Sequence, residues 1–331
     1  MGSLSIARLA QRPDGAHASQ MDLLPQKYAQ GYASAWHAAP PEVRGIILMC
    51  ASTICFSSMH VMIRHAAQEL HPMQIAFFRN FFGFLVFLPV LASSGLGFLH
   101  TKRIGLHAFR GVINVGAMLM FFYALSITEV AHATALGFSA PIFAGVLSVV
   151  FLGERFRMRR WVAIFAGFIG VMVILRPGII PLDTGPVLVI AASFCWAVVL
   201  TMIKVMSRTE SSLTIVAYMN IFLAIYSLGP ALWFWSWPSL DGWIWMVAIG
   251  VSGTVAQMFI SQSLKETDPT VVMPFEFLRL IWVAILGAWI FGEIPDQYTW
   301  IGGGIVFFAG FYLAWRERQA RREREAEPSA D

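Results

Sequence analysis

The stretch that decides the fold occupies residues 133–175 and reads ATALGFSAPIFAGVLSVVFLGERFRMRRWVAIFAGFIGVMVIL. A related stretch at residues 271–314 reads VVMPFEFLRLIWVAILGAWIFGEIPDQYTWIGGGIVFFAGFYLA. Each contains a long apolar run that ends in Gly-Glu, a short linker, a Trp, and a second apolar run rich in small residues. The two Gly-Glu pairs, Gly153-Glu154 and Gly292-Glu293, are 139 positions apart. This recurrence indicates that the chain contains an internal duplication.

The duplication extends over residues 45–315, with a shift of 139 or 140 positions between the two copies. We therefore expect two homologous units, at residues 45–176 and 185–315. The matched pairs are Gly45 with Gly185, Cys55 with Cys195, Phe56 with Trp196, Arg64 with Lys204, Asn80 with Asn220, Phe82 with Phe222, Leu125 with Leu264, Thr128 with Thr267, Phe138 with Phe277 and Trp161 with Trp300.

Hydrophobic residues make up 57% of the chain and charged residues 13%, against roughly 25% charged residues in ordinary soluble domains. So few charges cannot cover the surface of a soluble protein, which indicates that the solvent is lipid. A run of about 20 apolar residues crosses the hydrocarbon core of a bilayer. Ten such runs are predicted, at residues 45–64, 74–93, 106–125, 131–152, 160–176, 185–205, 213–235, 243–263, 270–291 and 297–315.

Backbone N–H and C=O groups find no partner in lipid, so the ten segments are predicted to be helices. Their continuous apolar character lacks the alternation of a β-barrel strand. Each copy of the duplication then holds five spans, and an odd number of spans inverts the second copy in the membrane. The predicted fold is an all-α integral membrane protein with ten transmembrane helices in two inverted five-helix repeats. Such repeats are typical of secondary transporters.

Lysine and arginine residues are distributed unequally between the two sides of the predicted topology. Nineteen lie on the side of the termini, Arg64 and Arg176 lie on the other side, and Arg79 and Arg279 fall within helices, which accounts for all 23. Basic loops stay cytoplasmic. We therefore expect a multi-pass membrane protein with both termini in the cytoplasm.

Residues 1–44 contain no apolar run and are predicted to form a disordered cytoplasmic leader, and residues 316–331 a charged cytoplasmic tail. The net charge is +4, but the basic residues are spread over loops and tail, where they match anionic lipid headgroups of the bilayer. No nucleic-acid partner is expected. Cys50, Cys55 and Cys195 lie in apolar segments and act as small hydrophobic residues, so no disulfide, metal site or cofactor is expected.

With these features the chain resembles the bacterial drug/metabolite transporter superfamily, and within it the two-domain EamA type. The resemblance rests on the two stretches quoted above and covers residues 45–315. It implies a ten-helix inner-membrane carrier of a small-molecule substrate, with the first four helices of each half around a central cavity and the fifth helices at the periphery. The second copy departs from the first, because Pro274 and residues 276–279 stand where the first copy has Ala135 and residues 137–140.

The Gly-Glu pairs have a structural interpretation. Gly153 and Gly292 are expected to end their helices in the left-handed conformation that glycine adopts readily. Glu154 and Glu293 then precede the next helix, where a carboxylate accepts unpaired amide hydrogens. Ion binding is the alternative.

Small residues in the fifth helix of each half permit close helix packing, with a homodimer interface as the alternative. They are Ala163, Ala166, Gly167, Gly170 and Gly302 to Gly304.

The functional hypothesis depends on the charged residues at membrane depth. Placing a charge at the bilayer centre costs at least about 2.5–3.5 kcal/mol of free energy, so such a residue usually faces a cavity or a partner. Glu276 and Arg279 are three residues apart and therefore share one helix face. They either pair with each other or face a central cavity, where Glu276 binds a cation or proton and Arg279 an anion. Pro274 and Pro141 each free a backbone carbonyl, so both helices are expected to bend there.

Arg79 and Asn80 lie in the second predicted helix, and Asn220 matches Asn80 in the second copy. Arg79 either contacts substrate or extends its long side chain to the outer interface. The two asparagines either line a cavity or join helices through hydrogen bonds. Asn114 and Gln257 are candidates of the same kind.

His132 opens the fourth predicted helix and can titrate near neutral pH, although a histidine near an interface is usually only solvated. Trp196 and Phe56 are matched by the repeat, and they either form a hydrophobic surface in the cavity or pack against core and lipid. The candidate residues for substrate binding or translocation are Glu276, Arg279, Asn80, Asn220, Asn114, Gln257, Arg79, His132 and Trp196.

These observations favour a secondary transporter that moves a small organic metabolite across the bacterial inner membrane by alternating access. Proton-coupled antiport and facilitated diffusion are both open, and coupling would require Glu276 to change its protonation state. A membrane-embedded enzyme would need clustered His, Asp or Cys residues or metal ligands at usable spacing. The predicted helices lack these, so no enzymatic activity is expected. A sensor or scaffold on a transporter fold is the remaining alternative.

Overall fold

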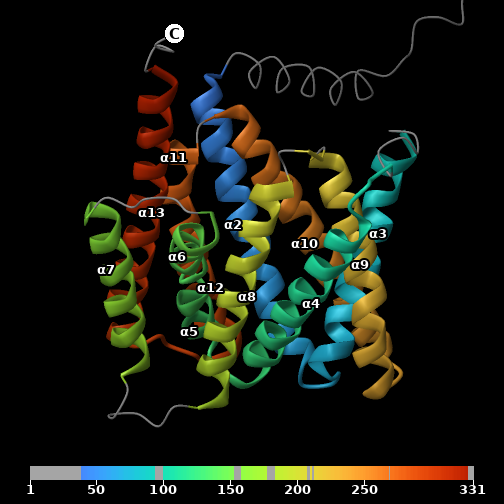
Figure 1. Ribbon diagram of the computed structural model, residues 1–331. Coiled ribbons are helices and arrows are strands. Elements are labelled where there is room, and N and C mark those ends of the chain that lie inside the picture. The colour runs from blue at the N-terminus through green and yellow to red at the C-terminus, as the bar shows by residue number, and fades with distance from the viewer. Residues whose placement is uncertain are drawn as a thin grey trace, which may run out of the picture.

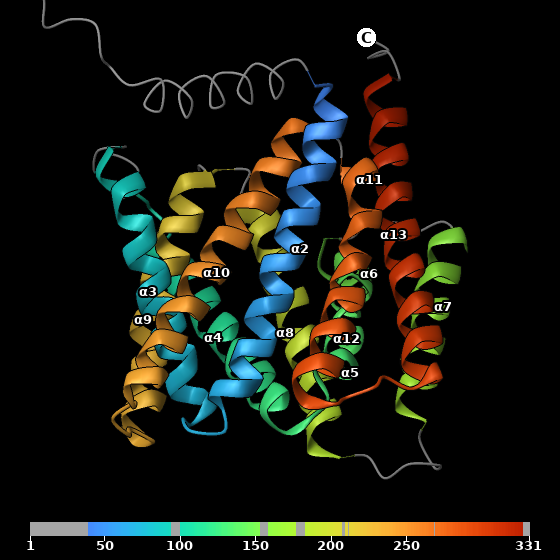
Figure 2. The same cartoon turned by 180° about the vertical axis from the view of Figure 1, so that it is seen from behind.

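Helices stand side by side and run between the two ends of the molecule in the computed structural model (Figures 1 and 2). α2 (Pro41–Ala66) begins and α13 (Gln297–Ala326) ends at the same end. We call this end the terminal face and the other end the opposite face. The structure describes residues 39–93, 100–152, 158–176, 183–206, 209–210, 212–267 and 269–326.

The described residues form helices and contain no strand, so the all-α prediction is confirmed for them. The first half contains, after α2, the helices α3 (Pro72–Ser93), α4 (Ile104–Ile127), α5 (Val130–Gly137), α6 (Ala140–Leu152) and α7 (Met158–Leu175). The second half contains α8 (Thr184–Met206), α9 (Ser212–Trp233), α10 (Leu240–Glu266), α11 (Pro269–Val272), the 3-10 helix η2 (Met273–Phe277), α12 (Leu278–Phe291) and α13.

Six segments of the described chain are long and apolar enough to cross a membrane, fewer than the ten predicted spans. The remaining helices, α3, α7, α12 and α13, stand beside them in the bundle (Figures 1 and 2). The outward surface is apolar: Phe165 is 66% exposed and Trp289 82% exposed. Exposed apolar side chains of this size are expected where a protein contacts lipid. The six segments are Pro41–Ala66, Ile104–Ile127, Val130–Leu147, Thr184–Ile203, Thr214–Trp233 and Leu240–Glu266.

Two of the predicted spans are interrupted helices. The segment predicted at 131–152 consists of α5 and α6, which are separated at Phe138 and Ser139. The segment predicted at 270–291 consists of α11, η2 and α12, with η2 ending at Phe277. Pro141 has no N–H to offer the carbonyl of Gly137, so a continuous helix would lose a hydrogen bond there. The bends predicted at Pro141 and Pro274 are therefore confirmed.

Helices of the two halves pack against each other in a reciprocal pattern. α2 packs most extensively against α10, and α8, its counterpart in the second half, packs against α4. α3 packs against α9, and α7 packs against α13. The bundle therefore interleaves the two copies of the duplication.

Glycines allow the backbones of α7 and α13 to approach closely. A side-chain carbon added at Gly170 would lie 2.9 Å from the carbonyl oxygen of Gly302. One added at Gly302 would lie 2.7 Å from the carbonyl oxygen of Gly170 and 3.1 Å from the backbone nitrogen of Ile174. The predicted role of these two glycines in close packing is confirmed.

Some details at the helix ends differ from the predictions. α2 begins at Pro41, within residues predicted as a leader, because proline suits the first turn of a helix. Arg110, one of the nineteen cations assigned to the side of the termini, is 1% exposed within α4 and donates to the carbonyl of Ile215 at 2.8 Å. Gly292 ends α12 with φ of +70°, as predicted. The predictions for Gly153-Glu154 and for residues 1–38 lie outside the described residues.

Gly302→Ala should lower the unfolding free energy by about 1–3 kcal/mol, because the added methyl group meets backbone atoms of α7 that cannot move aside. Thermal unfolding of the purified protein in detergent measures this loss. Gly304→Ala is the matched control, since a side-chain carbon added there would lie more than 4 Å from every described atom outside the backbone of its own helix and its chain neighbours. Equal melting temperatures for the two variants would contradict the close contact.

Candidate functional site

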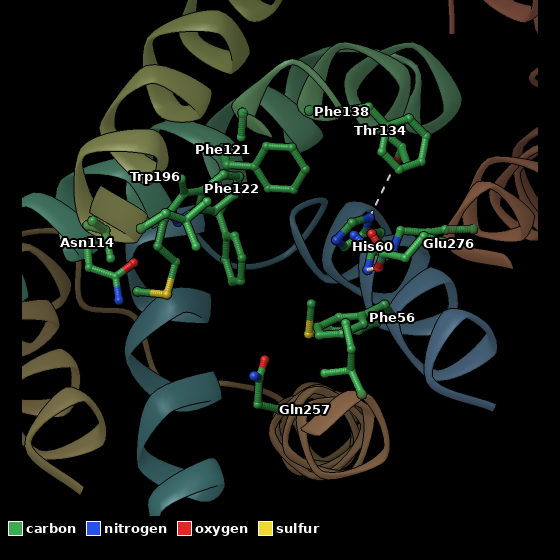
Figure 3. Close-up of a pocket in the computed structure, with 18 of the residues that line it drawn as sticks. Phe56, His60, Asn114, Phe121, Phe122, Thr134, Phe138, Trp196, Gln257 and Glu276 are labelled. Carbon is green, nitrogen blue, oxygen red and sulfur yellow. Dashed lines mark hydrogen bonds and ion pairs between the residues drawn. The ribbon is translucent and has the colours of Figure 1, made fainter. Parts of the chain in front are cut away.

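A central cavity of about 430 Å³ lies between the two halves, within the size range of small-molecule sites. α2, α3, α4, α5, α6, α8, α9, α10, η2 and α12 all contribute to its wall. Figure 3 shows labelled side chains of α2, α4, α5, α8, α10 and η2 around the space between these elements. The lining residues are Phe56, Met59, His60, Arg79, Asn114, Met118, Phe121, Phe122, Thr134, Gly137, Phe138, Ala140, Pro141, Trp196, Val199, Leu200, Met219, Leu223, Gln257, Ile260, Glu276 and Arg279.

Both interrupted helices meet this cavity. The break between α5 and α6 contributes Gly137, Phe138 and Ala140, and the break before α12 contributes Glu276 and Arg279. Helix breaks expose backbone groups that have lost their intrahelical partners. In a membrane such groups are tolerated where they face a cavity or protein rather than lipid.

Glu276 and Arg279 form an ion pair at the wall of the cavity. The guanidinium of Arg279 also lies 4.6 Å from the ring centroid of Phe56, a cation–π contact. The backbone carbonyl of Arg279 accepts a hydrogen bond from Ser57 at 3.0 Å. The pair therefore joins η2 and α12 to α2. The two side chains pair with each other, and they also line the cavity.

Aromatic rings form much of the cavity wall. Trp196 lies 5.1 Å from Phe121, centroid to centroid. In Figure 3, Trp196, Phe121 and Phe122 lie on one side of the space and Phe56 on another. Rings in this arrangement suit a planar apolar group of a ligand, because offset and edge contacts between rings are favourable.

His60 and Thr134 connect α2 to α5 at the cavity. The Nδ1 atom of His60 and the hydroxyl of Thr134 are 3.3 Å apart in a hydrogen bond, drawn as a dashed line in Figure 3. Both side chains are buried. His60 is the only histidine in the predicted span 45–64, a signal that could have selected it from the sequence. Phe121 and Phe122 gave no such signal, because phenylalanine is common throughout the chain.

Six of the nine candidate residues predicted from the sequence line the cavity, namely Glu276, Arg279, Asn114, Gln257, Arg79 and Trp196. The other three lie elsewhere. Asn220 donates to the carbonyl of Val216 in its own helix at 3.1 Å. His132 lies in a separate pocket of about 320 Å³ at the opposite face, beside Arg176 and Asp296.

Asn80, the third, is buried beside the cavity and joins helices. Its amide nitrogen donates to the carbonyl of Leu223 and to the hydroxyl of Ser227, both at 3.3 Å. Its oxygen accepts a hydrogen bond from Arg79 at 2.9 Å. Of the two interpretations offered for Asn80, the structure therefore shows the hydrogen bond between helices. Arg79 lines the cavity instead of extending to an interface.

Polar contacts close the bundle at the opposite face. Arg64 pairs with Glu293 at 3.2 Å and also donates to the carbonyls of Leu125 and Ser126 at the end of α4. Glu293 accepts a hydrogen bond from the backbone nitrogen of Val130, the first residue of α5, at 3.1 Å. Glu293 was predicted to accept amide hydrogens of the helix that follows it, but it accepts that of α5. Arg64 and Glu293 together tie the ends of α2, α4 and α12 to the start of α5.

A second charged cluster lies at the same face. Arg176 pairs with Asp296 and lies 4.6 Å from the ring of Tyr298. Burial opposes ionisation of Asp296, but hydrogen bonds from Thr299 and the charge of Arg176 outweigh it and lower the pKa of this carboxyl. Burial, and then the nearby carboxylates Glu293 and Asp296, raise the pKa of Glu129.

The described residues contain no group of three or more His, Cys, Asp or Glu side chains that could hold a metal ion.

Comparison with known proteins identifies the family. The sequence profile of the EamA-like transporter family matches residues 43–176 and again residues 183–315. An S-adenosylmethionine uptake transporter of Rickettsia prowazekii (strain Madrid E) is 31% identical over 278 residues, 84% of this chain and 95% of the relative. A riboflavin transporter of Vibrio cholerae serotype O1 is 28% identical over 288 residues, 85% of this chain and 97% of the relative.

A solved crystal structure has a similar fold. It covers 84% of this chain and 98% of its own chain, with a TM-score of 0.57 and 18% sequence identity. The central cavity and the interrupted helices are consistent with the two profile matches. The chain belongs to the EamA-like transporter family of the drug/metabolite transporter superfamily.

Proposed function

We propose that this protein takes up a small aromatic metabolite across the bacterial inner membrane by alternating access, with the central cavity as the binding site. Family membership makes it a transporter of small metabolites and not an enzyme. The substrates named for the relatives, S-adenosylmethionine and riboflavin, both contain a flat heteroaromatic ring. The cavity formed by Trp196, Phe121 and Phe56 between the two halves carries the proposal, because it offers such a ring an apolar surface.

The two halves act as inverted repeats. α2 begins at the terminal face, whereas its counterpart α8 begins at the opposite face, which supports the inversion (Figure 1). One contact between the halves also occurs at both ends of the bundle. A side-chain carbon added at Gly45 would collide with Thr267, and one added at Gly185 would collide with Thr128. Since Gly45 matches Gly185 and Thr128 matches Thr267, the same contact occurs twice with the roles of the halves reversed. Inverted repeats of this kind are suited to opening a site alternately to each side.

The terminal face is cytoplasmic in this proposal, because loops and helix ends rich in lysine and arginine stay in the cytoplasm. The cavity lies in the middle of the bundle. Its lining reaches Leu200 on α8 and Ile260 on α10, in the halves of these helices nearer the terminal face, and His60 on α2 and Phe122 on α4, in the halves nearer the opposite face. Arg64 and Glu293 close the other end. These contacts at the opposite face support an inward-facing state, in which uptake would release its solute.

Purified protein in liposomes should show saturable uptake of S-adenosylmethionine, riboflavin or a ring-containing analogue. Radiolabelled solute measures the flux, and a screen of thermal stability against a metabolite library selects further solutes, because a ligand that binds the folded carrier stabilises it by mass action. Absence of saturable flux for every stabilising solute would favour a sensor or scaffold on a transporter fold.

Glu276→Gln should destabilise the protein by on the order of 1–3 kcal/mol, because it leaves the charge of Arg279 without its partner at a site that is largely buried. Thermal unfolding measures the loss, and liposome flux should fall as well. The double variant Glu276→Gln/Arg279→Gln should recover most of the stability but not the flux. A single variant with unchanged stability would contradict the importance of the pair, and one with unchanged pH-gradient-driven flux would remove Glu276 as a proton site.

Glu293→Gln should open the far end of the cavity more often, because it removes the charge that holds Arg64 and weakens the bond to Val130. The measurement uses a protein without its native cysteines that carries Thr134→Cys in the cavity. An impermeant thiol reagent applied from outside should label this cysteine several-fold faster in the Glu293→Gln variant than in the protein that keeps Glu293.

Glu69→Gln is the matched control for this experiment. Glu69 also bonds the start of a helix at the opposite face, through the backbone nitrogen and hydroxyl of Ser239, but it lies outside the Arg64 contacts. Equal labelling of the Glu69 and Glu293 variants would contradict a specific closing role for Glu293.

A further inference from the structure

The positive and negative charges of the side chains that line the cavity do not cancel. Glu276 neutralises Arg279 through their ion pair. Arg79 also lines the cavity but forms no ion pair with any residue that the structure describes. Counting His60 as neutral, the cavity wall therefore carries two cations against one anion. The surplus charge belongs to Arg79.

Arg79 is held in place by neutral groups. Asn80 accepts its hydrogen bond at 2.9 Å, and Asn80 is in turn fixed by bonds to Leu223 and Ser227 of α9. A guanidinium has five N–H donors in a rigid fork. The bond to Asn80 uses one of its nitrogens, so the arrangement positions the group and leaves donors for another partner.

α10 leaves room for this guanidinium. A side-chain carbon added at Gly253 would lie 3.3 Å from Nε and 3.5 Å from an Nη atom of Arg79, and 2.6 Å from the sulfur of Met59. Gln257 follows Gly253 by one helical turn, on the same face, and lines the cavity. Asn114 of α4 lines it as well. The fork of Arg79 thus shares the cavity with two amide side chains that can also donate hydrogen bonds.

We propose that Arg79 determines specificity by binding an anionic group of the solute, a carboxylate or a phosphate, while the ring of the solute lies against Trp196 and Phe121. A guanidinium matches the two oxygens of such groups, and a charge at membrane depth is costly without a partner. The inference rests on the proposed function, since it assigns a substrate class to the same cavity. It separates this chain from a carrier built for a net cation such as S-adenosylmethionine.

Two pairs of probes test the proposal on the purified full-length protein, by titrated thermal shift. Flavin mononucleotide differs from riboflavin by a phosphate, and S-adenosylhomocysteine differs from S-adenosylmethionine by the loss of the S-methyl group and, with it, of the sulfonium charge. The wild type should bind the more negative member of each pair at least about tenfold more tightly, a difference of about 1.4 kcal/mol. The flavin pair tests whether Arg79 binds a phosphate. The adenosyl pair tests whether Arg79 binds a carboxylate when the ligand lacks the sulfonium cation.

Arg79→Gln should abolish the preference in both pairs, and Arg79→Lys should retain part of it because the charge remains. Asn80→Ala should reduce the preference by releasing Arg79. Its matched control is Asn220→Ala, the repeat-related asparagine whose bond stays within its own helix, and this variant should keep the preference. These variants keep the test informative if Arg79→Gln does not fold.

Equal binding within each pair, failure of the wild type to bind both negative probes, or an undiminished preference in Arg79→Gln or Asn80→Ala would overturn the assignment. Failure of the proposed function looks different. In that case the probes would bind with the predicted preference, yet liposomes would show no saturable flux of any solute.

Discussion

The hydrogen-bonding demand of the backbone is the constraint on which the structure depends. Lipid offers no partner to an N–H or C=O group, so a membrane helix can be interrupted only where protein or a cavity covers the break. The breaks at Phe138 and Phe277 are matched by the internal repeat, and both contribute to the wall of the cavity. The duplicated sequence therefore supplies two irregular segments, one from each half, to a single interior site. The regular helices around this site separate the irregular backbone from lipid.

Charged side chains also need partners inside a membrane, and the protein provides these partners in three ways. Glu276 and Arg279 compensate each other. Arg64 and Glu293 combine an ion pair with hydrogen bonds to exposed helix ends, so that a side-chain charge satisfies backbone groups at the opposite face. Arg79 is anchored by a hydrogen bond to the neutral side chain of Asn80. Of these three arrangements, only the last leaves a charge in the cavity without an oppositely charged partner among the described residues. This difference separates groups that hold the bundle together from a group suited to binding.

Much of this could be predicted from particular residues. The Gly-Glu and Trp pattern, repeated 139 positions apart, predicted the duplication, and Pro141 and Pro274 predicted the interruptions, because each effect acts on the local backbone. Glu276 and Arg279 were found because charge is rare at membrane depth. Asn80 and Asn220 looked equivalent by the repeat, yet one bonds a neighbouring helix and the other its own. Which neighbour a polar side chain meets depends on helix rotation, which the repeat does not encode.

The sequence by itself determined that the chain is helical, apolar on its surface, duplicated and related to EamA-type transporters, because hydrophobic run length and the spacing of glycine and proline act locally. The tertiary structure alone decided that Glu293 bonds the start of α5, that His132 lies away from the cavity, and that Gly253 makes room for Arg79. These contacts join residues far apart in the chain. They exist only once the two halves have interleaved, since the packing of one half against the other sets which faces meet.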